Sequence, residues 1–127
     1  MASSSMNAPS VINDTSNSNT ITIGTQIANL HSINIPYIGN YIVFVSVLYA
    51  DGSKKINGGI RIKSSSDYNI FGQAYDNYVR IGTDIGGYKS MSFGCFVQTK
   101  INNASLIVEG YNNPSILATI YISCMKV

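Results

Sequence analysis

The residues that could perform acid–base or nucleophilic chemistry are few and widely spaced along this chain of 127 residues. Glycoside hydrolysis needs two carboxyl groups flanking one bond, and nothing in the sequence brings two of them together. A nucleophile would have only His31 as its base, without an orienting partner. We therefore predict that the protein is not an enzyme. The six carboxylates stand singly at Asp14, Asp51, Asp67, Asp76, Asp84 and Glu109.

Metal and phosphate sites also lack their usual sequence patterns. No set of Cys and His residues has metal-ligand spacing. Cys95 and Cys124 lie inside apolar strand patterns, which favours buried free thiols over a disulfide. The glycine-rich segment 82–87 precedes a strand pattern rather than a helix, so we do not expect it to hold a phosphate. We expect neither a metal nor a cofactor.

One segment, residues 68–88, combines aromatic rings with short polar side chains. Tyrosine rings supply stacking area, and neighbouring amides supply directed hydrogen bonds, as in many loops that bind sugars or protein surfaces. The alternative for any single tyrosine is a structural role, with the ring packed and the hydroxyl at the rim. The residues predicted to bind a ligand are Tyr68, Tyr75, Asp76, Asn77, Tyr78, Arg80 and Tyr88.

The element that must organise the fold is segment 41–49, which has no charge and consists mostly of β-branched and aromatic residues. This composition predicts a central strand. Alternate side chains of a strand point to opposite faces, and both faces here are apolar. We therefore expect this strand to be covered on both sides, once by a second sheet and once by a loop or a neighbouring subunit.

A subunit interface also agrees with the low content of charged residues, which is 11% where about 25% is typical of soluble domains. Few charges leave little electrostatic repulsion between copies of the chain. The residues predicted to lie at this interface are Tyr41, Val43, Val45, Tyr49 and Tyr121.

The remainder of the chain predicts an all-β domain. About eight or nine short strands follow one another at spacings near ten residues, separated by Gly, Asn and Pro, and helical periodicity is missing. We expect an antiparallel sandwich or jelly roll over residues 20–127. Residues 1–19 are mainly Ser, Asn, Thr, Ala and Pro, which predicts a flexible polar N-terminal arm.

Charge and hydropathy argue against several partners. The net charge of +2 is small and scattered, so we expect no binding to nucleic acid. No apolar run approaches the roughly 18 residues needed to cross a bilayer, so we expect no membrane insertion. The N-terminus lacks the basic start and apolar centre of a signal peptide. We expect a protein that stays in the cell that makes it, or leaves by lysis or within a particle.

Three segments, 36–47, 104–111 and 118–127, carry a resemblance to a known family. Their apolar strands and turns resemble the globular-head jelly roll of the tumour-necrosis-factor and complement-head superfamily. They are more similar to its bacteriophage relatives, the trimeric head domains of tail fibres and capsid-surface proteins. The likeness covers residues 32–127. The chain has Asn102-Asn103 where members commonly have an acidic dipeptide, so a bound calcium is not carried over.

The resemblance implies a jelly-roll homotrimer that acts as a non-enzymatic virion structural protein. Such a protein would be a tail-fibre receptor-binding head or a capsid decoration protein at the virion surface. It would attach to a host-surface glycan or to another virion protein. The alternative is a soluble carbohydrate-binding lectin or the terminal head domain of a bacterial surface filament, because either would show the same strands and tyrosines.

Overall fold

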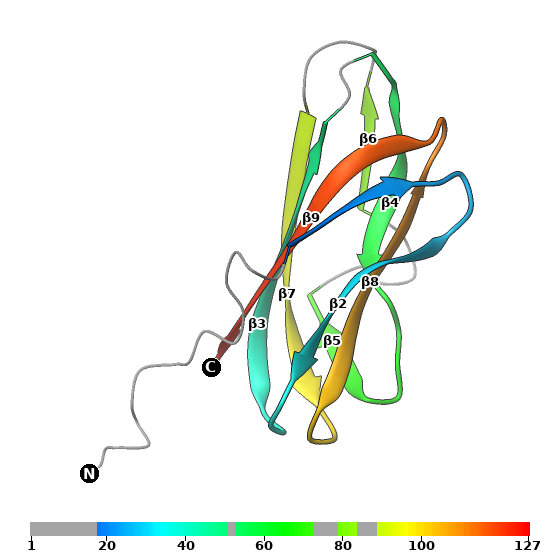
Figure 1. Ribbon diagram of the computed structural model, residues 1–127. Helices are drawn as coiled ribbons and strands as arrows, with labels where there is room; N and C mark the ends of the chain where they lie inside the picture. Colours follow the sequence, from blue (N-terminus) through cyan, green and yellow to red (C-terminus); the bar gives the residue numbers. More distant parts are fainter. Residues whose placement is uncertain (1–17, 51–52, 73–78, 84–88) are drawn as a thin grey trace.

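The computed structural model describes residues 18–50, 53–72, 79–83 and 89–127, and the regular structure in these residues is all β (Figure 1). Within this part of the chain, no helix is long and apolar enough to cross a membrane. The described strands are β1 (Ser18–Ile23), β2 (Ala28–Ile35), β3 (Asn40–Tyr49), β4 (Ile56–Ile62), β5 (Tyr68–Phe71), β6 (Val79–Thr83), β7 (Lys89–Thr99), β8 (Ala104–Asn112) and β9 (Ile116–Lys126).

The strands form two antiparallel sheets, which confirms the predicted all-β sandwich. One sheet has the order β1-β9-β3-β7-β5 and the other has the order β2-β8-β4-β6. Consecutive described strands alternate between the two sheets, so each neighbouring pair in a sheet joins strands that are distant in the sequence.

The central position of β3 follows from its apolar composition. It pairs along its length with β7 on one side and β9 on the other (Figure 1). Its inward side chains, from Tyr41 and Val43 through to Tyr49, are at most 2% exposed. Leu106 and Val108 of β8 and Ile60 of β4 belong to the same buried cluster, so the core lies between the two sheets. Burial of this kind provides most of the driving force for folding.

The opposite side of β3 is not covered by another layer of the described chain. Phe44 and Leu48 on that side remain 51% and 43% exposed. We expected both faces of this strand to be covered. Within the described chain the second sheet packs against one face of β3, and the other face is open.

The first strand begins two residues earlier than the sequence pattern indicated. Ser18 and Asn19, which were placed in the N-terminal arm, pair with Tyr121 and Ile120 of β9. Backbone pairing with β9 therefore extends β1 toward the N-terminus, past its first apolar residue. The rest of the predicted arm, residues 1–17, lies outside the described residues.

Both cysteines are free and buried, as predicted. Cys95 of β7 and Cys124 of β9 pair with the same residue, Val43, from opposite sides. Two strand spacings separate their backbones by about 10 Å, whereas a disulfide needs Cα atoms within about 7 Å. Burial raises the pKa of Cys95 to about 11 and that of Cys124 to about 12, so neither thiol ionises near neutral pH.

At one end of the sandwich, the turn between β7 and β8 is hydrogen-bonded to the turn between β2 and β3. Asn103 in this turn has a φ of 57°, a left-handed conformation that asparagine tolerates better than most residues. The side-chain oxygen of Asn102 accepts a hydrogen bond from the backbone nitrogen of Ile38 at 3.0 Å. The backbone nitrogen of Asn103 donates to the carbonyl of Pro36 at 3.0 Å. The asparagine pair therefore binds this turn to the one between β2 and β3.

At the other end of the sandwich, the completely buried Asn112 makes several hydrogen bonds to the backbone. Its Nδ2 donates to the carbonyls of Lys55 and Pro114 at 3.0 and 2.7 Å, and its Oδ1 accepts from the backbone nitrogen of Asn57 at 2.9 Å. Its backbone nitrogen donates to the carbonyl of Gly24 at 2.9 Å. The carboxamide of Asn112 thus provides hydrogen-bond partners for backbone groups of Lys55, Asn57 and Pro114.

Replacing Asn112 with alanine should destabilise the domain by roughly 2–4 kcal/mol, because three hydrogen bonds are lost and backbone groups are left buried without partners. The free energy of unfolding, measured by urea denaturation and circular dichroism, tests this. Asn57→Ala is the control, since the Asn57 side chain is exposed on the neighbouring strand. Equal stabilities of the two variants would contradict the role assigned to Asn112.

Candidate functional site

The structure describes only part of the predicted ligand-binding segment. Arg80 lies in β6, where its backbone pairs with Gly59 of β4, but its side chain is not described. Tyr68 is the only member of the set whose side chain can be placed. The remaining members lie outside the described residues: Tyr75, Asp76, Asn77, Tyr78 and Tyr88.

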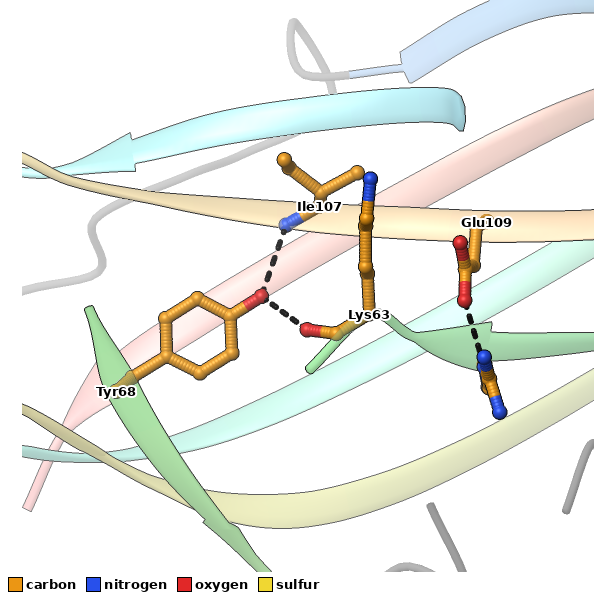
Figure 2. Close-up of polar contacts among 5 residues, drawn as sticks. Lys63, Tyr68, Ile107 and Glu109 are labelled. Atoms are coloured by element: carbon orange, nitrogen blue, oxygen red, sulfur yellow. Dashed lines mark hydrogen bonds and ion pairs between the residues drawn. The ribbon is translucent and has the colours of Figure 1, made fainter. Parts of the chain in front are cut away.

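Tyr68 has a structural role in the core. Its side chain is 2% exposed and crosses from β5 toward the four-stranded sheet (Figure 2). The hydroxyl donates to the carbonyl of Lys63 at 2.5 Å and accepts from the backbone nitrogen of Ile107 at 3.5 Å. So little exposure leaves the ring almost no face for stacking, and a ligand-binding role of Tyr68 stays a prediction.

The Tyr68 hydroxyl continues the ladder between β4 and β8 at the point where it ends. The backbone nitrogen of Lys63 still donates to the carbonyl of Ile107 at 2.8 Å. In a regular antiparallel pair the reverse bond would join the same two residues, and here the hydroxyl is inserted in its place. Burial is the main cause that raises the pKa of Tyr68 to about 12, and burial also raises that of Tyr49 to about 12.

Four of the five residues predicted to lie at a subunit interface point into the core of the chain. Tyr41, Val43, Val45 and Tyr49 are at most 2% exposed and lie in the core of their own chain, so they are not accessible to a partner. Only Tyr121 of that set is on the surface, at 38% exposure. Alternation along the strand revealed two apolar faces, but it could not indicate which of them meets the second sheet.

The side of the five-stranded sheet that faces away from the second sheet is not covered by the described chain, and we call it the outer face. Among the described residues, its outward-pointing side chains carry no charge. Serine, threonine, asparagine and glutamine lie between the apolar groups. The large apolar side chains on it, exposed by 37% to 54%, are Phe44, Leu48, Phe71, Phe96, Leu117, Tyr121 and Met125.

Strand register places several of these side chains in a continuous row. Phe71 of β5 pairs with Phe96 of β7, which pairs with Ile42 of β3, which pairs with Met125 of β9. Directly paired residues have neighbouring side chains on the same face. The row therefore crosses four adjacent strands.

A glycine on β7 shapes the surface beside this row. Gly94 pairs with Phe44, and a Cβ atom built on Gly94 would lie only 2.9 Å from Cε1 of Phe44. The phenylalanine ring thus lies over the glycine backbone instead of projecting between two larger side chains.

The apolar surface of the outer face lies at the upper end of what a solitary domain usually exposes. At roughly 200 Å² for a large side chain, the seven half-exposed residues together present about 600 Å² of mainly apolar surface. The largest apolar patch on a typical monomer is about 300–600 Å² and is often functional. The outer face therefore has the properties of a surface that binds another macromolecule.

The four-stranded sheet differs in its electrostatics. Arg61 of β4 and Glu109 of β8 are directly paired, and Nε of Arg61 lies 2.7 Å from Oε2 of Glu109 (Figure 2). Glu109 is only 5% exposed, so the guanidinium compensates a carboxylate that would otherwise lose its hydration. Within the described part of the chain, no group of three or more metal-ligating side chains occurs.

Comparisons of the chain with models of known protein families, with curated proteins and with solved structures found no match.

Replacing Tyr68 with phenylalanine should lower the free energy of unfolding by about 1–3 kcal/mol at neutral pH, because the carbonyl of Lys63 loses its donor. The difference in unfolding free energy between wild type and the variant should become smaller at alkaline pH. The pKa of Tyr68 is 10.0 when unfolded and about 12 when folded. Only the unfolded state loses this proton as the pH rises from 10 to 12, so this contribution to wild-type stability is lost over that range.

Urea denaturation at pH 8 to 12 measures the dependence, with Tyr37→Phe as the control, since Tyr37 is 67% exposed. The Tyr68→Phe variant should show a shallower loss of stability above pH 10 than wild type or the control. Parallel curves for all three proteins would contradict the assignment.

Proposed function

We propose that this protein is a non-enzymatic structural head domain of a virion, built as a jelly roll and assembled as a homotrimer. It acts by attachment, either to a receptor on the host surface or to the particle that carries it. The single observation that carries this proposal is the uncharged, mainly apolar outer face on a sandwich whose core is otherwise closed.

The order of the strands supports the jelly-roll assignment. Without the edge strand β5, the sheet orders β1-β9-β3-β7 and β2-β8-β4-β6 are those of eight strands wound as two Greek keys. In this arrangement the first strand lies beside the last, as β1 does with β9. The position of β3 between β9 and β7 agrees with the central strand that the composition of residues 41–49 predicts.

The outer face supports assembly between copies of the chain. An obligate subunit interface resembles a domain core that has been divided, and a standard interface buries about 800 Å² on each partner. The apolar residues of the outer face, with the small polar residues between them, approach this size. Because the face carries no charge among the described residues, copies can meet there without electrostatic repulsion.

The second candidate is a soluble lectin or the head of a bacterial surface filament, which would share the fold and the apolar face. The genes that neighbour its own distinguish the two classes: tail, baseplate or capsid genes favour the virion. Purified particles that contain the chain by mass spectrometry would support the virion role, whereas its absence from particles encoded by the same genome would contradict that role.

Light scattering after gel filtration tests the assembly. The wild-type protein should have three times the chain mass of 13.7 kDa. Phe96→Asp should yield a folded monomer, because a charge would be buried in the centre of the interface while the core of each chain remains intact.

Tyr37→Ser is the control, since it removes a comparably exposed aromatic side chain from the turn between β2 and β3. This variant should remain a trimer. A monomeric wild-type protein at micromolar concentration would contradict the proposed assembly. A trimer that persists in Phe96→Asp would show that the subunits use another surface.

A further inference from the structure

A groove lies on the side of the sandwich where β1 and β2 form edges of their sheets. Each of these strands pairs on one flank only among the described strands, β1 with β9 and β2 with β8. The groove has a volume of about 440 Å³, and small-molecule sites usually measure about 300–1,000 Å³. The register of β2 shifts between Asn29 and His31. Such irregularities redirect the side chains of edge strands and are common beside binding sites.

The polar lining of the groove consists of side chains that donate and accept hydrogen bonds, without a carboxylate, lysine or arginine among them. It comprises the carboxamides of Asn19 and Asn29, the imidazole of His31 and the hydroxyl of Ser32. Asn19 is held in position because its Nδ2 donates to the carbonyl of Leu30 at 2.8 Å. Within the described part of the chain, the side chains of Asn29 and Ser32 make no hydrogen bond, so their donors and acceptors are available to a ligand.

The apolar lining comes from three strands. Ile21 of β1, Leu30 of β2 and Ile107 of β8 contribute side chains to the groove. Leu30 is 3% exposed and Ile21 packs against the core, so this part of the lining is supported from beneath. Such support fixes the shape of the groove before a ligand binds, which lowers the entropic cost of binding.

The chemistry of the lining selects a neutral ligand. None of the residues that line the groove is a carboxylate or a lysine or arginine cation, so a charged ligand would lose hydration without gaining a counter-charge. The ligand must also combine an apolar surface with groups that both donate and accept hydrogen bonds. A pyranose ring has this combination, with C–H groups on its faces and hydroxyls around its rim.

We propose that this groove binds a neutral hexose unit of a glycan. The C–H face of the sugar lies against Ile21 and Ile107, and its hydroxyls bond to Asn29 and Ser32. The site is distinct from the predicted segment 68–88 and from the outer face. The binding chemistry follows from the groove itself, while its use as a receptor site depends on the attachment function proposed above.

Methyl NMR on the full chain, labelled at isoleucine and leucine, tests the proposal directly. The probes are glucose, galactose, mannose and N-acetylglucosamine, each titrated separately. At least one should cause saturable shifts in the methyl signals of Ile21, Leu30 and Ile107, with a dissociation constant in the millimolar range expected for a single small ring. The signals of Ile38 and Ile101, exposed in turns outside the groove, should not move.

A matched pair of variants on β2 identifies the hydrogen-bonding residue. Asn29→Ala should weaken binding about 2- to 10-fold, as expected for the loss of a hydrogen bond to a neutral group. Asn34→Ala should bind as wild type, because Asn34 is exposed on the same strand but does not line the groove. Since Asn29 is exposed, its replacement should leave the fold intact, which circular dichroism checks.

Three results would overturn the site: no saturable shift with any of the four sugars, shifts confined to Ile38 and Ile101, or equal binding by Asn29→Ala and wild type. Tighter binding of sialic acid than of the neutral sugars would overturn the selection for a neutral ligand. These results are independent of the mass measurement. A monomer that binds the sugar in this groove would contradict the proposed trimer and support the site. A trimer that binds none of the sugars would support the assembly and contradict the site.

Discussion

The burial of the inner side of β3 is the constraint on which the rest of the structure depends. Five alternate residues from Tyr41 to Tyr49 are removed from water only when β7 and β9 flank the strand and the second sheet covers it. Because consecutive strands alternate between the sheets, these neighbours come from distant parts of the chain. The core therefore forms as a single unit, and the loop entropy of these long-range pairings is compensated only when both sheets are present.

Closing such a sandwich leaves backbone groups at the ends of strands without ladder partners, and a few buried polar side chains satisfy them. Asn112 joins the start of β4 to the end of β8, and the hydroxyl of Tyr68 occupies the last position between β4 and β8. At the end near Pro36, the exposed Asn102-Asn103 turn is hydrogen-bonded to the turn between β2 and β3. Tyr68, which resembled binding chemistry in the sequence, thus has a structural role, since an unpaired buried backbone group is costly.

The two surfaces of functional interest both lack acidic side chains, lysine and arginine among their described residues. The outer face is apolar and uncharged among the described residues, which suits contact between large surfaces. The groove at the β1 and β2 edges is smaller, neutral and more polar, which suits a ligand with hydroxyl groups. Assembly and ligand binding are therefore assigned to different parts of the sandwich, so that each can be altered by substitution without the other.

The sequence by itself determined the class of fold, because the alternation of apolar residues and the spacing of Gly, Asn and Pro depend only on local geometry. It also determined the central place of residues 41–49 and the free state of Cys95 and Cys124. It could not determine which apolar side of β3 faces inward, since both sides satisfy the same alternation, and so the interface prediction included Tyr41 and Val43, which lie in the core. The burial of Tyr68, the row from Phe71 to Met125 and the groove beside Asn29 were decided only by the tertiary structure, because each depends on the register between strands that are far apart in the chain.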